Sequence, residues 1–128
     1  DLDTVMPSFV FSDYGDFLRT GANFVAEDSD DFKAVGFNDV IFKAFTEGYL
    51  SSALPFLTPV EISHLPFAAA LFPYMQCVRF LTDYLNGDTY YKIKYDEHNY
   101  VRTKNQLLLF QDARRKERMM TEFIHQTI

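Results

Sequence analysis

The sequence has one cysteine, few basic residues and no long apolar run. Each shortage argues against one class of protein. Cys77 cannot form a disulfide within the chain, which fits a reducing compartment. The longest apolar run, 65–75, is too short for a membrane span and contains Pro66 and Pro73. No signal peptide is recognisable. We therefore expect a cytoplasmic protein that does not bind a membrane.

Basic residues are outnumbered by acidic ones, twelve against eighteen, and the formal net charge is −6. This balance argues against general nucleic-acid binding, which needs a positive surface. The charge is also uneven along the chain. Residues 1–64 contain eleven acids and three bases, whereas residues 65–128 contain seven acids and nine bases.

Apolar and aromatic residues, by contrast, are plentiful. Hydrophobic residues make up 48% of the 128 residues and aromatic residues 17%. This length and composition predict a single domain over 1–128 with a core of its own. So many aromatic side chains also predict an exposed apolar patch, which could pair two copies as a homodimer.

The spacing of apolar residues predicts a mainly α domain with a short N-terminal strand. Thr58, Pro59 and Glu61 form the clearest helix start, with an N-cap, a first-turn proline and a capping-box glutamate. Asn38 is a plausible N-cap for the helix before it, and Gly87 a plausible helix stop. The expected elements are a strand over 1–5 and helices over about 13–26, 39–54, 58–65, 66–85 and 99–126.

The first motif that suggests chemistry is Asp1-Leu2-Asp3. On a strand, Asp1 and Asp3 would point to the same face and could bind Mg²⁺. Two solvated acids at a strand end are an equally plausible interpretation. The pattern also resembles the first motif of haloacid dehalogenase-like phosphatases, which implies a nucleophilic Asp1 and an acid/base Asp3. That family needs a parallel sheet, and the rest of the sequence supplies no succession of strand–helix units.

The second constellation lies near the end of the helix predicted over 66–85. Gln76, Arg79 and Asp83 are spaced by three and four residues and therefore share one helix face. They could form a solvated stripe with an Arg79–Asp83 ion pair. Alternatively they line a polar cleft, in which Arg79 donates hydrogen bonds and Asp83 accepts sugar hydroxyls or braces Arg79. Asp88 and Tyr90 follow the helix and could reach the same cleft.

Four longer segments of the sequence are DLDTVMP, SDYGDFLRTGAN, RFLTDYLNGDTYYKI and HNYVRTKNQ. Together they resemble the C-terminal part of the aminoglycoside phosphotransferase/choline kinase-like superfamily, most closely its N-acetylhexosamine 1-kinase-like members. The resemblance covers residues 1 to about 110 and includes long motifs. It implies that the chain is the helical C-lobe portion of a protein-kinase-like fold.

The resemblance also implies roles for single residues. Asp1 would bind the Mg²⁺ that accompanies the nucleotide phosphates. Arg79 and Tyr90 would contact the acceptor sugar, with Asp83 beside them. A structural or supporting role is implied for a further set of residues: Asp3, Asp13, Asp16 and Tyr84.

The implied activity is transfer of the γ-phosphate of ATP to a hydroxyl of a hexosamine-type sugar. No catalytic residue is expected within this chain, because the catalytic loop, the phosphate-covering loop and the nucleotide-binding lysine of such kinases would precede residue 1. We therefore expect Mg²⁺ and ATP to act in a longer parent protein, and the isolated chain to be inactive. The alternative from another class is a stand-alone helical interaction module derived from such a kinase.

Other charged features have simpler explanations. The three histidines, His64, His98 and His125, show no metal-ligand spacing and are expected on helix surfaces or in caps. The acidic stretch 27–36 lacks the calcium-loop pattern and is expected to be a solvated loop. The basic cluster within 114–118 is expected to be a solvated helix face.

Overall fold

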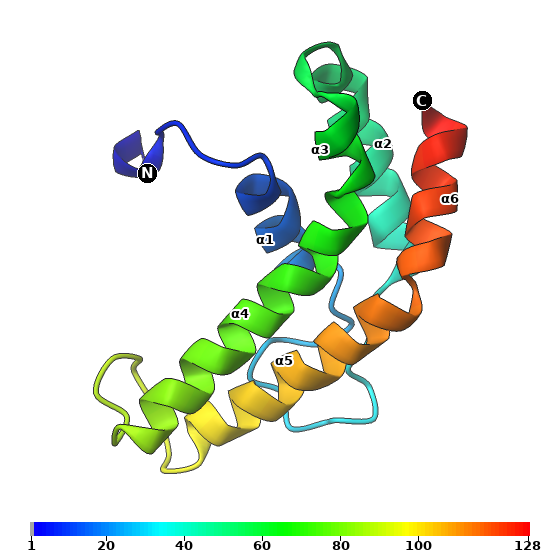
Figure 1. Ribbon diagram of the computed structural model, residues 1–128. Coiled ribbons are helices and arrows are strands. Elements are labelled where there is room, and N and C mark those ends of the chain that lie inside the picture. Colours follow the sequence, from blue (N-terminus) through cyan, green and yellow to red (C-terminus); the bar gives the residue numbers. More distant parts are fainter. Residues whose placement is uncertain (1) are drawn as a thin grey trace.

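The computed structural model describes residues 2–128 and shows a mainly α protein, as the sequence predicts (Figure 1). The described residues contain no strand, only an isolated bridge between Asn23 and Phe37. None of the helices in this part of the chain is long and apolar enough to cross a membrane. The elements are η1 (Leu2–Thr4), α1 (Phe11–Gly21), α2 (Asp39–Ala53), η2 (Leu54–Phe56), α3 (Pro59–Ser63), α4 (Leu65–Leu85), α5 (His98–Arg115) and α6 (Glu117–Thr127).

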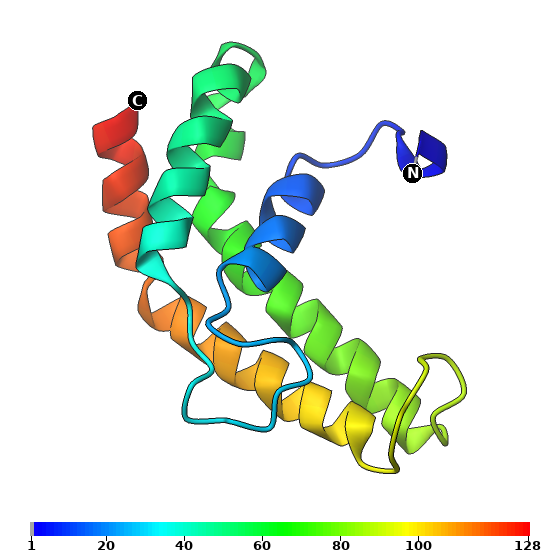
Figure 2. The ribbon, with the colours of Figure 1, turned by 180° about the vertical axis from the view of Figure 1, so that it is seen from behind.

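The two longest helices, α4 and α5, lie side by side and form the most extensive contact in the molecule (Figure 1). The short helix α1 packs on α4, and α2 lies beside α6 near the opposite end from the 86–97 loop. Seen from behind, the irregular segment 22–38 passes over α5 (Figure 2). The N-terminal segment extends away from the helices.

The predicted N-terminal strand is wrong for the residues that the structure describes. Residues Leu2–Thr4 form a 3-10 helix, and Leu2 and Val5 are 85% and 76% exposed. A strand is stable only when a neighbouring strand satisfies its backbone groups, and residues 2–128 provide none here. Asp1, the predicted metal ligand, lies outside the described residues.

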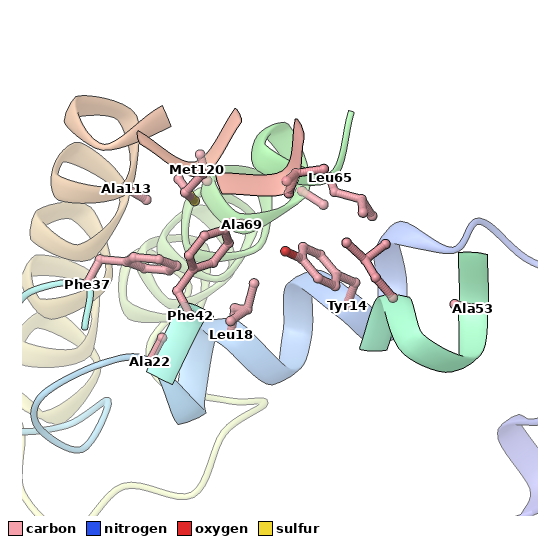
Figure 3. Packing of buried hydrophobic residues seen from close by; sticks show 14 of the residues in the cluster. Tyr14, Leu18, Ala22, Phe37, Phe42, Ala53, Leu65, Ala69, Ala113 and Met120 are labelled. Carbon is pink, nitrogen blue, oxygen red and sulfur yellow. The ribbon is translucent and has the colours of Figure 1, made fainter. Parts of the chain in front are cut away.

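The core is built where α1, α2, α4 and α6 meet (Figure 3). In α1 and its C-cap, Tyr14, Leu18 and Ala22 follow at intervals of four residues and are completely buried. The Tyr14 hydroxyl and the Thr46 hydroxyl form a 2.7 Å hydrogen bond inside this core. Burial raises the pKa of Tyr14 well above its usual range, so the phenol stays neutral.

Gly15 explains how closely α1 can approach α4. A side-chain carbon at this position would lie 2.6 Å from the carbonyl oxygen of Ala68. The glycine between Asp13 and Asp16 therefore has a packing role.

Helix boundaries follow the sequence signals closely where a cap is present. Asn38 accepts hydrogen bonds from the Val40 and Ile41 amides and starts α2. Thr58 and Glu61 form the predicted capping box of α3. Helix α4 ends at Leu85, just before Gly87, as predicted.

Two predicted helices extend too far. Helix α1 stops at Gly21 instead of near residue 26, because Ala22 and Asn23 turn away and pair with the segment around Phe37. The predicted helix over 99–126 is two helices, α5 and α6, which meet at Lys116. The Lys116 ammonium binds Asp112, four residues earlier, and also the Phe37 carbonyl and Asp39. The last two contacts are distant in the sequence and are invisible in local periodicity.

The acidic stretch 27–36 is not simply a solvated loop. Glu27 forms an ion pair with Arg19, whose side chain is mostly buried. Asp28 lies 3.0 Å from His98, and the backbone of Ala26 and Ser29 accepts hydrogen bonds from the Asn105 amide. These contacts attach the segment to α1 and α5 and leave only part of it, including Asp30 and Asp31, exposed.

Candidate functional site

A cleft whose lining includes several polar side chains lies at the C-terminal end of α4. Its volume is about 460 Å³, and the loop 86–97 between α4 and α5 forms one wall. Side chains from two sequence neighbourhoods meet here because the chain reverses direction after Leu85. The lining residues are Val78, Arg79, Thr82, Asp83, Asn86, Thr89, Tyr90 and Tyr91.

The reversal depends on two residues with positive φ. Gly87 has a φ of 90° and Asp88 a φ of 61°. Glycine adopts such angles freely, and aspartate is one of the few other residues that tolerate them. The Gly87 amide donates to the Tyr84 carbonyl and the Asp88 amide to the Asp83 carbonyl, which closes the end of α4.

Asp83 is the anchor of the cleft wall. Its side chain points inward and the residue is only 5% exposed. The carboxylate accepts hydrogen bonds from the backbone amides of Tyr90 (2.8 Å) and Tyr91 (3.0 Å), and from the Asn99 side chain (2.8 Å). Burial raises the pKa of Asp83, whereas the hydrogen bonds from these donors lower it. The hydrogen bonds together have the larger effect, so the pKa lies below its usual value.

Asn99 connects the cleft wall to α5 and is completely buried. Its amide nitrogen donates to Asp83 and also to Asp88, at 2.9 Å. Its carbonyl oxygen accepts a 2.9 Å hydrogen bond from Arg102, which also donates to the Lys92 carbonyl. One amide side chain therefore holds two carboxylates and an arginine in fixed positions.

The open side of the cleft is formed by Arg79 and two tyrosines. The Arg79 guanidinium lies 5.9 Å from the Tyr90 ring centroid and 5.7 Å from that of Tyr91, within cation–π range. Tyr91 packs on Phe80, and its hydroxyl accepts a hydrogen bond from Gln76. Tyr90 is 73% exposed. The cleft thus presents aromatic surface beside a charged fork of donors.

The solvated Arg79–Asp83 ion pair does not form among the described residues. Arg79 instead has a 3.4 Å contact with Gln76 on its own helix. Asp83 is turned away from solvent toward the loop backbone, which carries its hydrogen bonds. The interpretation of this face as a plain solvated stripe is therefore wrong, and the structure has a cleft at this place.

Of the predicted site residues that the structure describes, Arg79, Asp83 and Tyr90 come together in the cleft, whereas Asp3, Asp13, Asp16 and Tyr84 lie elsewhere. Tyr84 lies on another side of α4, donates to Glu97 and packs on Tyr100. The contact with Glu97 raises the pKa of Tyr84 above its usual value. Asp13 and Asp16 are exposed on α1, where Asp16 pairs with Arg19, and Asp3 lies in η1.

Several residues of the site were not predicted from single-residue reasoning. Asn99 and Arg102 belong to the quoted segment HNYVRTKNQ, but no role was assigned to them. His98 was expected on a helix surface or in a cap, yet it is 1% exposed and bonds Lys94 and Asp28. One signal in the sequence could have indicated these residues. The segment that forms α5 is rich in polar residues but has to pack against the apolar α4, so some of its polar side chains must be buried.

The described residues do not form a metal centre by themselves. Residues 2–128 contain no group of three histidine, cysteine or carboxylate side chains placed to hold a metal ion. The side chains present therefore do not fit a complete Mg²⁺ site, and we derive no chemical step through a metal.

A scan of the sequence against protein-family models finds no family model that matches.

Proposed function

We propose that this chain is the C-terminal helical part of an ATP-dependent sugar kinase of the superfamily it resembles, and that its cleft contributes to the site for the acceptor sugar. The observation that carries the proposal is the meeting of Arg79 and Tyr90. The resemblance implies that both contact the sugar, and they come from different elements onto the same 460 Å³ cleft.

The chemistry of the cleft suits a small polyhydroxylated ligand. Ligand sites combine apolar and aromatic walls with a few polar groups that fix orientation. Tyr90 and Tyr91 provide the aromatic wall, while Arg79 offers guanidinium donors to hydroxyl or amide oxygens. The Thr82 hydroxyl lies on the same wall and can donate or accept.

For Asp83 the geometry supports a positioning role more than direct contact. Three hydrogen bonds from the protein occupy most of the acceptor sites of its carboxylate. We propose that Asp83 holds Tyr90 and Tyr91 in place and has at most one acceptor position left for a sugar hydroxyl.

Mg²⁺ and ATP enter the proposal only through the resemblance. In the parent kinase, Asp1 would bind the metal, and Asp3, Asp13 and Asp16 would support that region. Phosphoryl transfer depends on positioning and electrostatic stabilisation from several separate elements. This chain is therefore proposed to be inactive alone, in a protein of the cytoplasm.

Titration of the ¹⁵N-labelled chain with N-acetylhexosamines, followed by nuclear magnetic resonance, tests the cleft directly. We expect the amide signals of Thr82, Tyr90 and Tyr91 to shift at millimolar sugar, and Arg79→Ala to abolish the shifts. Arg118→Ala, at an exposed arginine on α6, is the matched control. Shifts that are absent, or that persist in Arg79→Ala, would count against this function.

A second candidate function, an interaction module that forms a homodimer, has one observation in its favour. Helix α4 keeps several large apolar side chains exposed along one side. The residues on this side are spaced alternately by four and three, the seven-residue repeat of a coiled-coil seam. Phe67, Tyr74, Val78, Leu81 and Leu85 are exposed, and Leu71 is half-buried.

Sedimentation of the chain at increasing concentration separates the two functions. A dimer that dissociates in a Leu81→Lys variant would support the module, with Gln111→Lys, at an exposed polar position on α5, as control. A chain that remains monomeric at high concentration would reject it and leave the sugar cleft untouched. The phosphatase alternative requires a parallel sheet, and residues 2–128 contain no strand to build one.

A further inference from the structure

The loop 86–97 is the irregular wall of the cleft, and its position depends on a small number of anchors. It contains neither helix nor strand, so regular backbone hydrogen bonding does not fix its shape. Three side chains from the adjacent helices hold its backbone. Asp83 accepts from Tyr90 and Tyr91, Arg102 donates to the Lys92 carbonyl, and His98 accepts from the Lys94 amide.

His98 differs from the other anchors because it also reaches a second loop. Its Nδ1 atom accepts the Lys94 amide proton at 3.1 Å. Its Nε2 atom lies 3.0 Å from a carboxylate oxygen of Asp28, seventy residues away in the sequence. The ring is 1% exposed and stacks on Tyr95 with a centroid distance of 4.7 Å. One imidazole thus joins two irregular segments that no helix connects directly.

The two hydrogen bonds determine where the ring proton lies. A backbone amide can only donate, so Nδ1 must be unprotonated. Nε2 then carries the proton and donates it to the Asp28 carboxylate. This bond lowers the pKa of Asp28, which keeps the carboxylate ionised as an acceptor. A second proton on the imidazole would place an N–H group against the Lys94 N–H and break that contact.

We propose that His98, as the neutral Nε2–H tautomer, is a positioning residue that fixes the cleft loop against the 22–38 segment. The inference holds whichever ligand the cleft takes, because it rests on the protein's own contacts. It also assigns a purpose to Asp28, which holds the tautomer in place. The charged groups at the His98–Asp28 pair are Asp28 itself and Arg102. The other neighbours of the His98 ring are the Lys94 amide and the Tyr95 ring.

Two isosteric substitutions separate the two bonds of the ring. In His98→Asn the amide oxygen can take the place of Nδ1, so the Lys94 contact is kept and the Asp28 contact is lost. In His98→Gln the amide nitrogen can take the place of Nε2, so the Asp28 contact is kept and the Lys94 contact is lost. If His98 only filled space, the two substitutions would have similar effects on the loop.

Hydrogen exchange of the ¹⁵N-labelled chain is the test. We expect His98→Gln to speed exchange of the Lys94 amide by about tenfold or more, the equivalent of one lost hydrogen bond. Tyr90 and Tyr91 should exchange faster as well, whereas His98→Asn should preserve the protection of Lys94. Core amides such as Leu109 report global stability and serve as the reference in each variant. In the wild type, a long-range ¹H–¹⁵N spectrum should show the Nε2–H tautomer.

Three results would overturn the proposal. One is an Nδ1–H tautomer or a doubly protonated ring at neutral pH. Another is equal Lys94 exchange in both variants after correction for the Leu109 reference. The third is unchanged loop exchange in both, which would mean that Asp83 and Arg102 suffice to hold the loop.

Discussion

At the scale of single residues, a polar side chain that touches no solvent holds the candidate site together. Asn99 is completely buried and satisfies Asp83, Asp88 and Arg102 at once. Buried carboxylates are costly unless they are hydrogen-bonded, and an amide can donate to two of them without adding charge. The cleft wall therefore depends on a residue that no ligand could contact.

Replacing Asn99 by alanine should lower the free energy of unfolding by about 2–4 kcal/mol, since several buried polar groups lose their partner together. Gln111→Ala, at an exposed position on the same helix, should change it by less than about 0.5 kcal/mol. Urea unfolding followed by circular dichroism measures both. Equal effects of the two substitutions would contradict the role given to Asn99.

Asp83 should make the stability of the protein depend on pH in the acid range. Its pKa in the folded state lies below the ordinary value, so its contribution is present above about pH 4 and is lost as the pH falls through that region. The side chain of Asn in Asp83→Asn cannot titrate, and its amide NH2 group would face a backbone N–H, so that two donors meet. The variant should be less stable than the wild type at pH 7.

Thermal melts from about pH 7 to about pH 3 check this prediction. The gap between wild type and Asp83→Asn should narrow as the pH falls. Asp28 and Asp112 also have lowered pKa values, so some acid destabilisation should remain in the variant. A gap that is constant over the whole range would show that Asp83 gains nothing from its charge.

At the scale of helices, the close approach of α1 to α4 gives a sharp test at Gly15. A side-chain carbon there would collide with the backbone of Ala68, so Gly15→Ala should destabilise the fold by about 1–3 kcal/mol. Gly48 is the matched control, because nothing lies within 4 Å of the corresponding position in α2. Gly48→Ala should stabilise by about 0.5–1 kcal/mol through helix propensity. Two substitutions of the same sign would contradict the packing described here.

The helices that the sequence predicts best are those with local end signals. The Asn38 and Thr58 caps and the Gly87 turn depend on residues within a few positions, and each appears where predicted. The errors arise from distant contacts. The last predicted helix is divided at Lys116, whose ammonium binds the Phe37 carbonyl seventy-nine residues away. Leu2–Thr4 lacks the neighbouring strand that a strand needs.

The candidate site shows the same division between local and distant information. The shared helix face of Arg79 and Asp83 left two interpretations open, a solvated stripe and a polar cleft, and the contacts between distant residues decide between them. The burial of Asp83 was not predictable, because it depends on Asn99 from the next helix. His98 and Asp28 meet only through the folded loop and leave no local pattern.

At the scale of the whole molecule, the described residues form a folded helical unit in which no group of three histidine, cysteine or carboxylate side chains could hold a metal ion. The cleft lies at one end of the α4–α5 pair, whereas the N-terminal segment that leads to Asp1 extends away from the helices (Figure 1). The exposed seam of α4 is a further surface without a cover among these residues. We propose that both features belong to a chain that works as part of a larger protein.

This arrangement predicts that the isolated chain binds Mg-ATP weakly or not at all. Residues 2–128 hold no cluster of metal ligands, and a single aspartate such as Asp1 cannot replace the several elements that hold a nucleotide. Isothermal titration calorimetry with Mg-ATP should show no saturation in the micromolar range. A micromolar dissociation constant would refute the view that the chain lacks the nucleotide site.

The central claim is that the cleft belongs to the acceptor-sugar site of a kinase. The most direct measurement is steady-state phosphoryl transfer to an N-acetylhexosamine by the longer protein that the proposal implies, with and without Arg79→Ala. The account predicts a KM for the sugar raised by about 10- to 100-fold, the loss expected for a charge-assisted hydrogen bond. The KM for ATP should stay within about twofold of the wild type. A sugar KM that Arg79→Ala leaves unchanged, or a protein that transfers no phosphate to any such sugar, would contradict it.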